Sequence, residues 1–226
     1  MLAIESPGGV FLIDCGGDVI QRCLMAGLDP ARITGMLVTH EHPDHVAGFP
    51  LFMTKLYLHG RRNPIPVYGI ESAVTQAEIC FGCFDTESWE NLTEIEWHVI
   101  EDLSVPILQT ADFTLTGAFG THGVQTIGVR IDALDGSFSV TYSGDTEPCD
   151  AITQLAKRSS LLIHEANGEG HGHTSVIEAA EVAKASGAEK LILVHLSDET
   201  SVDDLRAARD VFPNVALAEE LMMLQG

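Results

Sequence analysis

The sequence is poor in basic residues and has no hydrophobic run long enough to cross a membrane. Its 12 Lys and Arg face 33 Asp and Glu, which gives a formal net charge of −21. A protein with this negative charge repels polyanions and has no broad basic surface for nucleic acid. No apolar run approaches the roughly 20 residues of a membrane helix, and the first nine residues lack the basic start and apolar core of a signal peptide. We therefore expect a cytoplasmic protein that makes no membrane contact.

Cysteine is also scarce. The five cysteines are an odd number and are scattered along the chain, so reduced thiols are expected. Cys80 and Cys83 form a C-x-x-C, but no second pair accompanies them for a structural zinc site. We interpret them as packing residues near a helix end. The chain of 226 residues is 45% hydrophobic, which predicts one domain over residues 1–226 with a real core.

Apolar runs and turn residues alternate along the chain and predict its elements. Helices are expected at 18–26, 46–58, 71–80, 175–185 and 202–211, and strands at 10–14, 36–39, 64–69, 94–100, 112–119, 126–131, 138–142, 161–164, 190–196 and 215–217. Strands and helices in this order suggest an α+β fold (αββα), with two β-sheets packed face to face and helices on the outer faces.

The most informative segment is His40-Glu41-His42-Pro43-Asp44-His45, which directly follows an apolar run. In an extended segment alternate side chains point the same way, so His40, His42 and Asp44 can face one spot. His45 can turn toward a neighbouring spot as the chain enters a helix. Imidazole and carboxylate donors at this spacing suit divalent metal ions. A solvated polar loop is the alternative, and the metal hypothesis is favoured because three histidines and an aspartate seldom fall so close together.

Further candidate ligands follow other predicted strands. His122, Asp145 and His195 each stand where an apolar run ends. Taken singly such residues are more often structural, but their common placement at strand ends favours a shared metal site. His173 lies in a glycine-flanked loop ahead of a helix and could donate to a substrate oxyanion; His171 is its rival for this role.

These motifs, in this order, resemble the metallo-β-lactamase superfamily. The chain is most similar to the ribonuclease Z branch and its small phosphodiesterase relatives, through Gly48-Phe49-Pro50, His164-Glu165-Ala166 and Gly172-His173-Thr174-Ser175. The resemblance implies a metal-dependent hydrolase in which two divalent ions, zinc or else manganese or iron, activate water. It assigns one ion to His40, His42, His122 and Asp145, and the other to Asp44, His45, His195 and the bridging Asp145. Asp44 would orient the attacking water, and His173 would contact the phosphate. Asp14 would hold the segment 40–45, called the metal loop below, from beneath.

The chain departs from ribonuclease Z in one segment. Ribonuclease Z carries a long arm that grips tRNA between the positions of His122 and Asp145, whereas only 22 residues separate them here. We therefore expect a small phosphodiester or nucleotide substrate. The alternatives are ribonuclease Z-type tRNA 3′ cleavage, a lactonase, thioesterase or sulfatase on the same scaffold, and a non-catalytic metal-binding or interaction module.

The sequence leaves the role of one basic cluster and the oligomeric state undecided. Lys55, Arg61 and Arg62 form the one basic cluster near the metal loop. It is interpreted as solvated surface, or as a contact for a single phosphate. The sequence also leaves a homodimer open.

Overall fold

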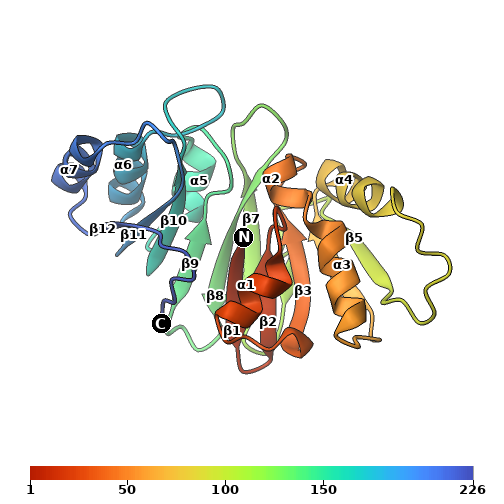
Figure 1. Cartoon of the computed structure of the whole chain (residues 1–226). Helices are drawn as coiled ribbons and strands as arrows, with labels where there is room; N and C mark the ends of the chain where they lie inside the picture. Colours follow the sequence, from red (N-terminus) through yellow and green to blue (C-terminus); the bar gives the residue numbers. More distant parts are fainter. Residues whose placement is uncertain (226) are drawn as a thin grey trace. The chain divides into compact units, whose positions relative to one another are not determined.

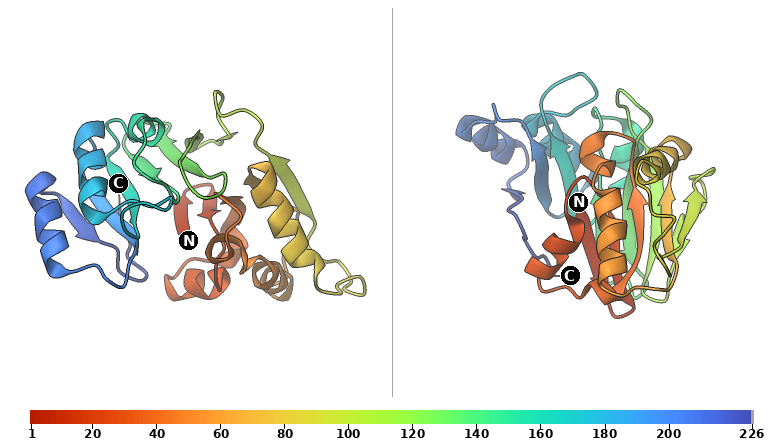
Figure 2. Two further views of the ribbon diagram at one scale, coloured as in Figure 1. Left: turned by 90° about the horizontal axis from the view of Figure 1, so that it is seen from above. Right: turned by 45° about the vertical axis from the view of Figure 1, so that its right-hand side comes forward.

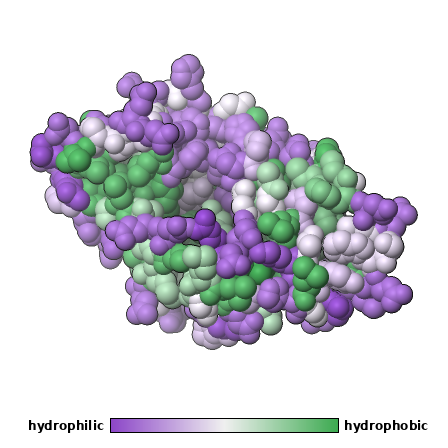
Figure 3. All heavy atoms as spheres, in the orientation of Figure 1, coloured by the Kyte–Doolittle hydropathy of each residue, from purple (hydrophilic) through white to green (hydrophobic). Residues whose placement is uncertain are grey.

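The computed structural model describes residues 1–225. The backbone separates into two compact units, the first covering Met1–Asp102 and the second beginning at Leu103. Among the described residues, no helix combines the length and the apolar character needed to cross a membrane. Figure 3 shows a mostly hydrophilic face with apolar residues gathered in patches.

A five-stranded sheet and four α-helices make up the first unit. The strand order is β1-β2-β3-β4-β5; β1 pairs antiparallel with β2, and the other neighbours are parallel. Figure 1 shows α1, α3 and α4 beside this sheet. The elements are β1 (Leu2–Ser6), β2 (Gly9–Ile13), α1 (Val19–Met25), a 3₁₀ turn (Pro30–Arg32), β3 (Ile33–Val38), α2 (Pro43–Val46), α3 (Phe49–Leu58), β4 (Ile65–Gly69), α4 (Glu71–Gly82) and β5 (Ile95–Val99).

Local sequence explains the strands and the first helix of this unit. All five residues of β2 are buried, as expected for an interior strand with neighbours on both sides. The helix α1 begins after Asp18, whose carboxylate accepts the N–H of Gln21, a standard cap for the free amides of a first turn. Gly27 ends it with a φ of 78°, a conformation that glycine adopts without steric cost.

The predicted helix over 46–58 is wrong at its start, because the chain forms two helices there. α2 ends at Val46, and α3 begins at Phe49. Between them the N–H of Gly48 donates to the carbonyl of Cys15 at 2.7 Å. A Cβ on Gly48 would lie 2.2 Å from the carbonyl oxygen of Gly17. The break therefore follows from the close packing of this turn against the 15–17 backbone.

The second unit contains a seven-stranded sheet in the order β12-β11-β10-β9-β8-β7-β6. Strands β9 to β12 are parallel, and β6 to β9 are antiparallel. Figure 2 shows α6 and α7 lying side by side next to the parallel strands. The elements are β6 (Leu108–Gln109), β7 (Phe113–Phe119), β8 (Ile127–Ala133), β9 (Ser139–Tyr142), α5 (Asp150–Leu155), β10 (Leu161–Ala166), α6 (Val176–Ser186), β11 (Leu191–Leu196), α7 (Val202–Val211) and β12 (Val215–Leu217).

One connection in this unit bears on function. β8 and β9 form an antiparallel pair, and residues 134–138 join them. This hairpin fills most of the 22 residues between His122 and Asp145, so the described chain has no protruding arm there.

The α+β class with two sheets and helices is confirmed. β1, β6 and α5 were not predicted from the sequence, and the structure adds them. A single domain over residues 1–226 stays a prediction.

Candidate metal centre

The first unit gathers the four predicted residues of the histidine-rich loop where β3 ends. Nε2 of His40 lies 3.2 Å from Nδ1 of His42, and Nε2 of His45 lies 3.4 Å from Oδ2 of Asp44. Zinc bonds of 2.0–2.1 Å in a tetrahedron place neighbouring donor atoms about 3.3 Å apart. His40 and His45 are buried, and Asp44 is exposed. The spacing of these donor atoms fits metal coordination.

Asp14 supports this loop from the end of β2. Its buried carboxylate accepts the backbone N–H of Thr39 at 2.8 Å, the Thr39 hydroxyl at 2.9 Å and Nδ1–H of His45 at 2.8 Å. The φ of Asp14 is 65°, an uncommon conformation that Asp and Asn tolerate better than most residues. Because Nδ1 of His45 is held by Asp14, its Nε2 is the atom available to a metal.

The turn after Asp14 packs directly on the metal loop. The N–H of Cys15 donates to the carbonyl of His45 at 2.6 Å. A Cβ on Gly16 would lie 1.6 Å from the carbonyl oxygen of Asp44, whereas one on Gly17 would meet no atom within 4 Å. Position 16 therefore requires glycine if the loop is to keep this path.

The second unit gathers the other predicted residues. His122 follows β7, Asp145 follows β9, His195 lies near the end of β11, and His173 precedes α6. One donor atom from each of His122, Asp145 and His173 lies within 4.8 Å of the others. Oδ2 of Asp145 is 3.2 Å from Nδ1 of His195. The strands thus bring together side chains from four separate segments.

His122 and His195 are oriented by the backbone around them. Nδ1–H of His122 donates to the carbonyl of Gly172 at 2.7 Å, so Nε2 is the ring nitrogen that could bind a metal. His195 has a φ of 49°, which is rare for a residue other than glycine and places strain at the candidate site.

Glu165 belongs to this group, although the sequence analysis gave it no role. Its carboxylate is fully buried and accepts Nδ1–H of His173 at 2.9 Å. It also accepts three backbone N–H groups, those of Thr146, Asn167 and Thr174. Burial raises the pKa of Glu165 to about 8, against the lowering effect of the hydrogen bonds from the Asn167 and Thr146 amides. The position of Glu165 at the end of β10 was the available signal, the same one that singled out Asp145.

His173, rather than its rival His171, joins the cluster. The ring of His173 contacts those of His122 and His195, with centroids 4.8 and 5.4 Å apart. His171 is exposed and adopts a φ of 55°. The Glu165–His173 hydrogen bond fixes the orientation of the His173 ring.

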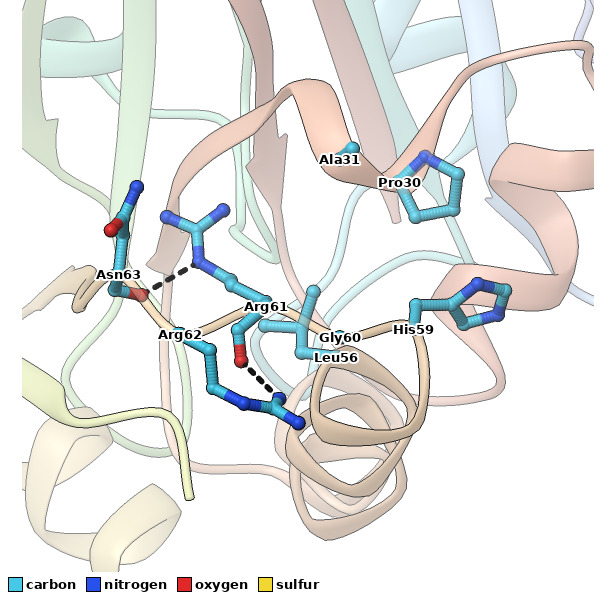
Figure 4. Close-up of a pocket in the computed structure, with 8 residues that line it drawn as sticks. All are labelled: Pro30, Ala31, Leu56, His59, Gly60, Arg61, Arg62 and Asn63. Carbon is cyan, nitrogen blue, oxygen red and sulfur yellow. Dashed lines mark hydrogen bonds between the residues drawn. The ribbon is translucent and has the colours of Figure 1, made fainter. Parts of the chain in front are cut away.

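The three residues of the basic cluster all make contacts within the chain. Lys55 pairs with Asp18 at 2.5 Å. Arg61 donates to the carbonyls of Ile33, Asn63 and Pro64, and Figure 4 shows its contact with Asn63. The Arg62 guanidinium lies 5.1 Å above the Tyr57 ring. The two interpretations of this cluster, solvated surface and phosphate contact, fit Arg61 poorly, because carbonyl oxygens already take up its donors.

A shallow hollow lies beside these arginines. Its volume is about 320 Å³, and Figure 4 shows the residues around it. It is lined by Pro30, Ala31, Leu56, His59, Gly60, Arg61, Arg62 and Asn63. None of the candidate metal ligands lines it.

The donor atoms of both units are imidazole nitrogens and carboxylate oxygens. No thiolate takes part among the described groups, and this donor set suits zinc, manganese or iron. The two ring nitrogens held by Asp14 and by the Gly172 carbonyl have the outer hydrogen bonds that metal-binding histidines usually make. The residues present therefore fit divalent metal ions.

Residues 10–196 match the sequence-family model described as the beta-lactamase superfamily domain. The chain belongs to this superfamily, and it is a metal-dependent hydrolase with a metallo-β-lactamase fold.

Among its relatives is a protein named ribonuclease Z from Methanothermobacter thermautotrophicus. It is 28% identical over 283 aligned residues, which cover 99% of this chain and 90% of the relative. Ribonuclease BN of Erwinia tasmaniensis is 29% identical, with 94% and 88% covered. The alignment of 283 positions is longer than this chain of 226 residues, so the relative carries segments that this chain lacks.

The solved structures agree on the fold. The metallo-β-lactamase fold protein YhfI from Bacillus subtilis is 26% identical with a TM-score of 0.77, and the match covers 96% of this chain and 88% of that one. Human tRNase Z, short form, is 22% identical with a TM-score of 0.78, covering 99% and 90%. The latter likeness concerns the fold alone.

Proposed function

We propose that this protein is a metal-dependent phosphodiesterase. The observation that carries the proposal is the 2.9 Å hydrogen bond between His173 and the buried Glu165, set among donor atoms that fit metal ions. Its support from the comparisons is the name ribonuclease Z, since cleavage of RNA is hydrolysis of a phosphodiester.

The proposed ligands are the seven residues expected from the resemblance. One ion would be held by His40, His42, His122 and Asp145, and the other by Asp44, His45, His195 and Asp145. When bound, two such ions supply an ionised water as nucleophile and neutralise charge on the phosphoryl oxygens. Zinc is the proposed metal, on the chemistry of the donor set.

The chain's own residues would complete the reaction. Asp44, the exposed carboxylate of the loop, would orient the attacking water. His173 would donate a proton from Nε2 to the leaving oxygen, because the hydrogen bond from Nδ1 to Glu165 fixes the orientation of the ring. Asp14 would keep the His45 ring in place through its hydrogen bond to Nδ1.

Two substrates compete within this class. The names of the relatives favour ribonuclease Z-type cleavage of tRNA precursors over the small phosphodiester or nucleotide that the sequence predicts. The short β8–β9 connection and the net charge of −21 support the small substrate, because a polyanion is repelled by an acidic protein. A cytoplasmic location stays a prediction, as does a homodimer.

A substrate panel tests the proposal. Metal-loaded protein is assayed with bis-p-nitrophenyl phosphate, a cyclic nucleotide, a tRNA precursor with a 3′ trailer, a lactone and a thioester. Turnover of phosphodiesters above the other esters is expected. Cleavage of the precursor at its 3′ end would identify the ribonuclease Z activity, and preferred turnover of a lactone or thioester would overturn the proposal.

A matched pair of variants tests the role of His173. His173→Gln should lower kcat by a factor of about 10² to 10⁴, the usual contribution of a general acid, with metal content unchanged. His171→Gln, an exposed histidine two residues away, should keep wild-type activity. Equal loss in both variants would contradict the assignment.

A further inference from the structure

Glu147 connects two segments that carry candidate site residues. Its backbone N–H donates to the carbonyl of Thr121 at 2.7 Å, immediately before His122. Its side-chain Oε1 accepts the N–H of Gly172 at 2.9 Å, immediately before His173. Thus one residue is bonded to the neighbours of both histidines.

Gly172 completes a closed ring of contacts. Its carbonyl accepts Nδ1–H of His122 at 2.7 Å, while its N–H is held by Glu147. A Cβ at this position would lie 2.6 Å from Nδ1 of His122, so the loop backbone touches the His122 ring directly. Movement of Gly172 therefore moves the hydrogen bond that orients the ring.

Glu165 holds the two ends of the loop by accepting the N–H groups of Asn167 and Thr174, and the middle of the loop is rich in glycine. Gly168, Gly170 and Gly172 all have positive φ values, and glycine has the greatest backbone freedom of any residue. Within the loop, the N–H of Gly168 donates to the carbonyl of Thr174 and the N–H of His173 donates to the carbonyl of Gly170, both at 3.1 Å. A half-buried carboxylate at the Gly172 amide is thus a principal anchor of this segment.

We infer that Glu147 is a positioning residue, whose carboxylate holds Gly172 so that the His122 ring presents Nε2 to a metal and His173 stays in the cluster. The inference rests on the proposed function for the role of His122 as a ligand. Glu147 touches neither a metal nor a substrate in this account. Its effect passes through the Gly172 backbone.

Three substitutions separate hydrogen-bond reach from charge. Glu147→Ala removes the acceptor, and Glu147→Asp keeps the charge but shortens the side chain by one methylene. Glu147→Gln keeps an acceptor oxygen without the charge. Glu169→Ala, an exposed carboxylate on the same loop, is the control for a change in local charge.

The first measurement is metal affinity by competition with a chromophoric chelator. Glu147→Ala and Glu147→Asp should raise the metal dissociation constant about 10-fold, the lower end of the range for losing an outer partner of a ligating histidine. Glu147→Gln and Glu169→Ala should stay within about threefold of wild type. Wild-type affinity in Glu147→Ala, or equal loss in Glu147→Gln, would overturn the inference.

The second measurement uses metal-free protein and needs no substrate. Hydrogen exchange at the Gly172 amide should be slow in wild type and Glu147→Gln and faster in Glu147→Ala and Glu147→Asp. Unchanged exchange in Glu147→Ala would overturn the inference. A failure of phosphodiesterase activity alone would leave both readouts intact, so the two hypotheses fail separately.

Discussion

The buried ring of His164 gives a quantitative prediction for stability against pH. His164 is fully buried in β10, and its Nδ1–H donates to the carbonyl of Glu165 at 2.8 Å. Its Nε2 makes no hydrogen bond to the described residues. Burial lowers the pKa of His164 from 6.5 to about 4, against smaller raising effects of the Glu165 carbonyl and Glu178.

The sign of the effect follows from proton binding. Between pH 6.5 and 4 the unfolded chain binds a proton at His164 that the folded chain excludes, so stability falls as pH falls. Each pH unit costs about 1.4 kcal/mol, and the loss from pH 7 to pH 4 is about 3 kcal/mol. Above pH 6.5 the histidine is neutral in both states and contributes no further change.

Urea unfolding of metal-free protein at pH 7 and pH 4 measures this loss. His164→Leu removes the titrating ring, so its stability should fall by about 3 kcal/mol less than that of wild type between the two pH values. His59→Leu, at an exposed histidine, should fall as wild type does. An equal loss in wild type and His164→Leu would refute the reasoning.

Three further predictions concern the residues around the site. Asp14→Asn keeps a side chain that tolerates positive φ but weakens the hold on His45, so metal affinity should fall about 10- to 100-fold in a chelator titration; unchanged affinity would contradict the role of Asp14. Gly16→Ala should lower the free energy of unfolding in urea by about 1–3 kcal/mol, because its Cβ would strike the Asp44 carbonyl. Gly17→Ala, where a Cβ meets open space, should be nearly neutral. Equal effects of the two substitutions would argue against this packing. Arg61→Met should cost about 1–2 kcal/mol by leaving the part-buried carbonyls of Ile33 and Pro64 without this donor, with KM unchanged and Arg62→Met nearly neutral; a raised KM with normal stability would instead make Arg61 a substrate contact.

Local signals made much of the fold predictable. The Asp18 cap and Gly27 marked both ends of α1, and apolar runs marked the parallel strands β10 and β11. The strand β1 was missed because residues 2–6 are only partly buried at a sheet edge. The break at Gly48 was missed because it depends on backbone contacts with residues 15–17, which lie far away in sequence.

The candidate site was predictable where polar residues follow apolar strands. This rule found His122, Asp145 and His195 but passed over Glu165, which it also describes. The hydrogen bond from Glu165 to His173 spans eight residues and depends on the fold of the intervening glycine-rich loop. The role of Glu147 depends in the same way on a contact with Gly172, 25 residues further along the chain. Contacts of this kind have no periodic signal in the sequence.

The most direct test of the proposed centre is a count of metal ions per chain in wild type and in Asp145→Ala. Asp145 is assigned to both ions, so the variant should lose bound metal and phosphodiesterase activity together, whereas wild type should hold two ions. Two ions retained per chain in Asp145→Ala would contradict the shared carboxylate on which the account depends.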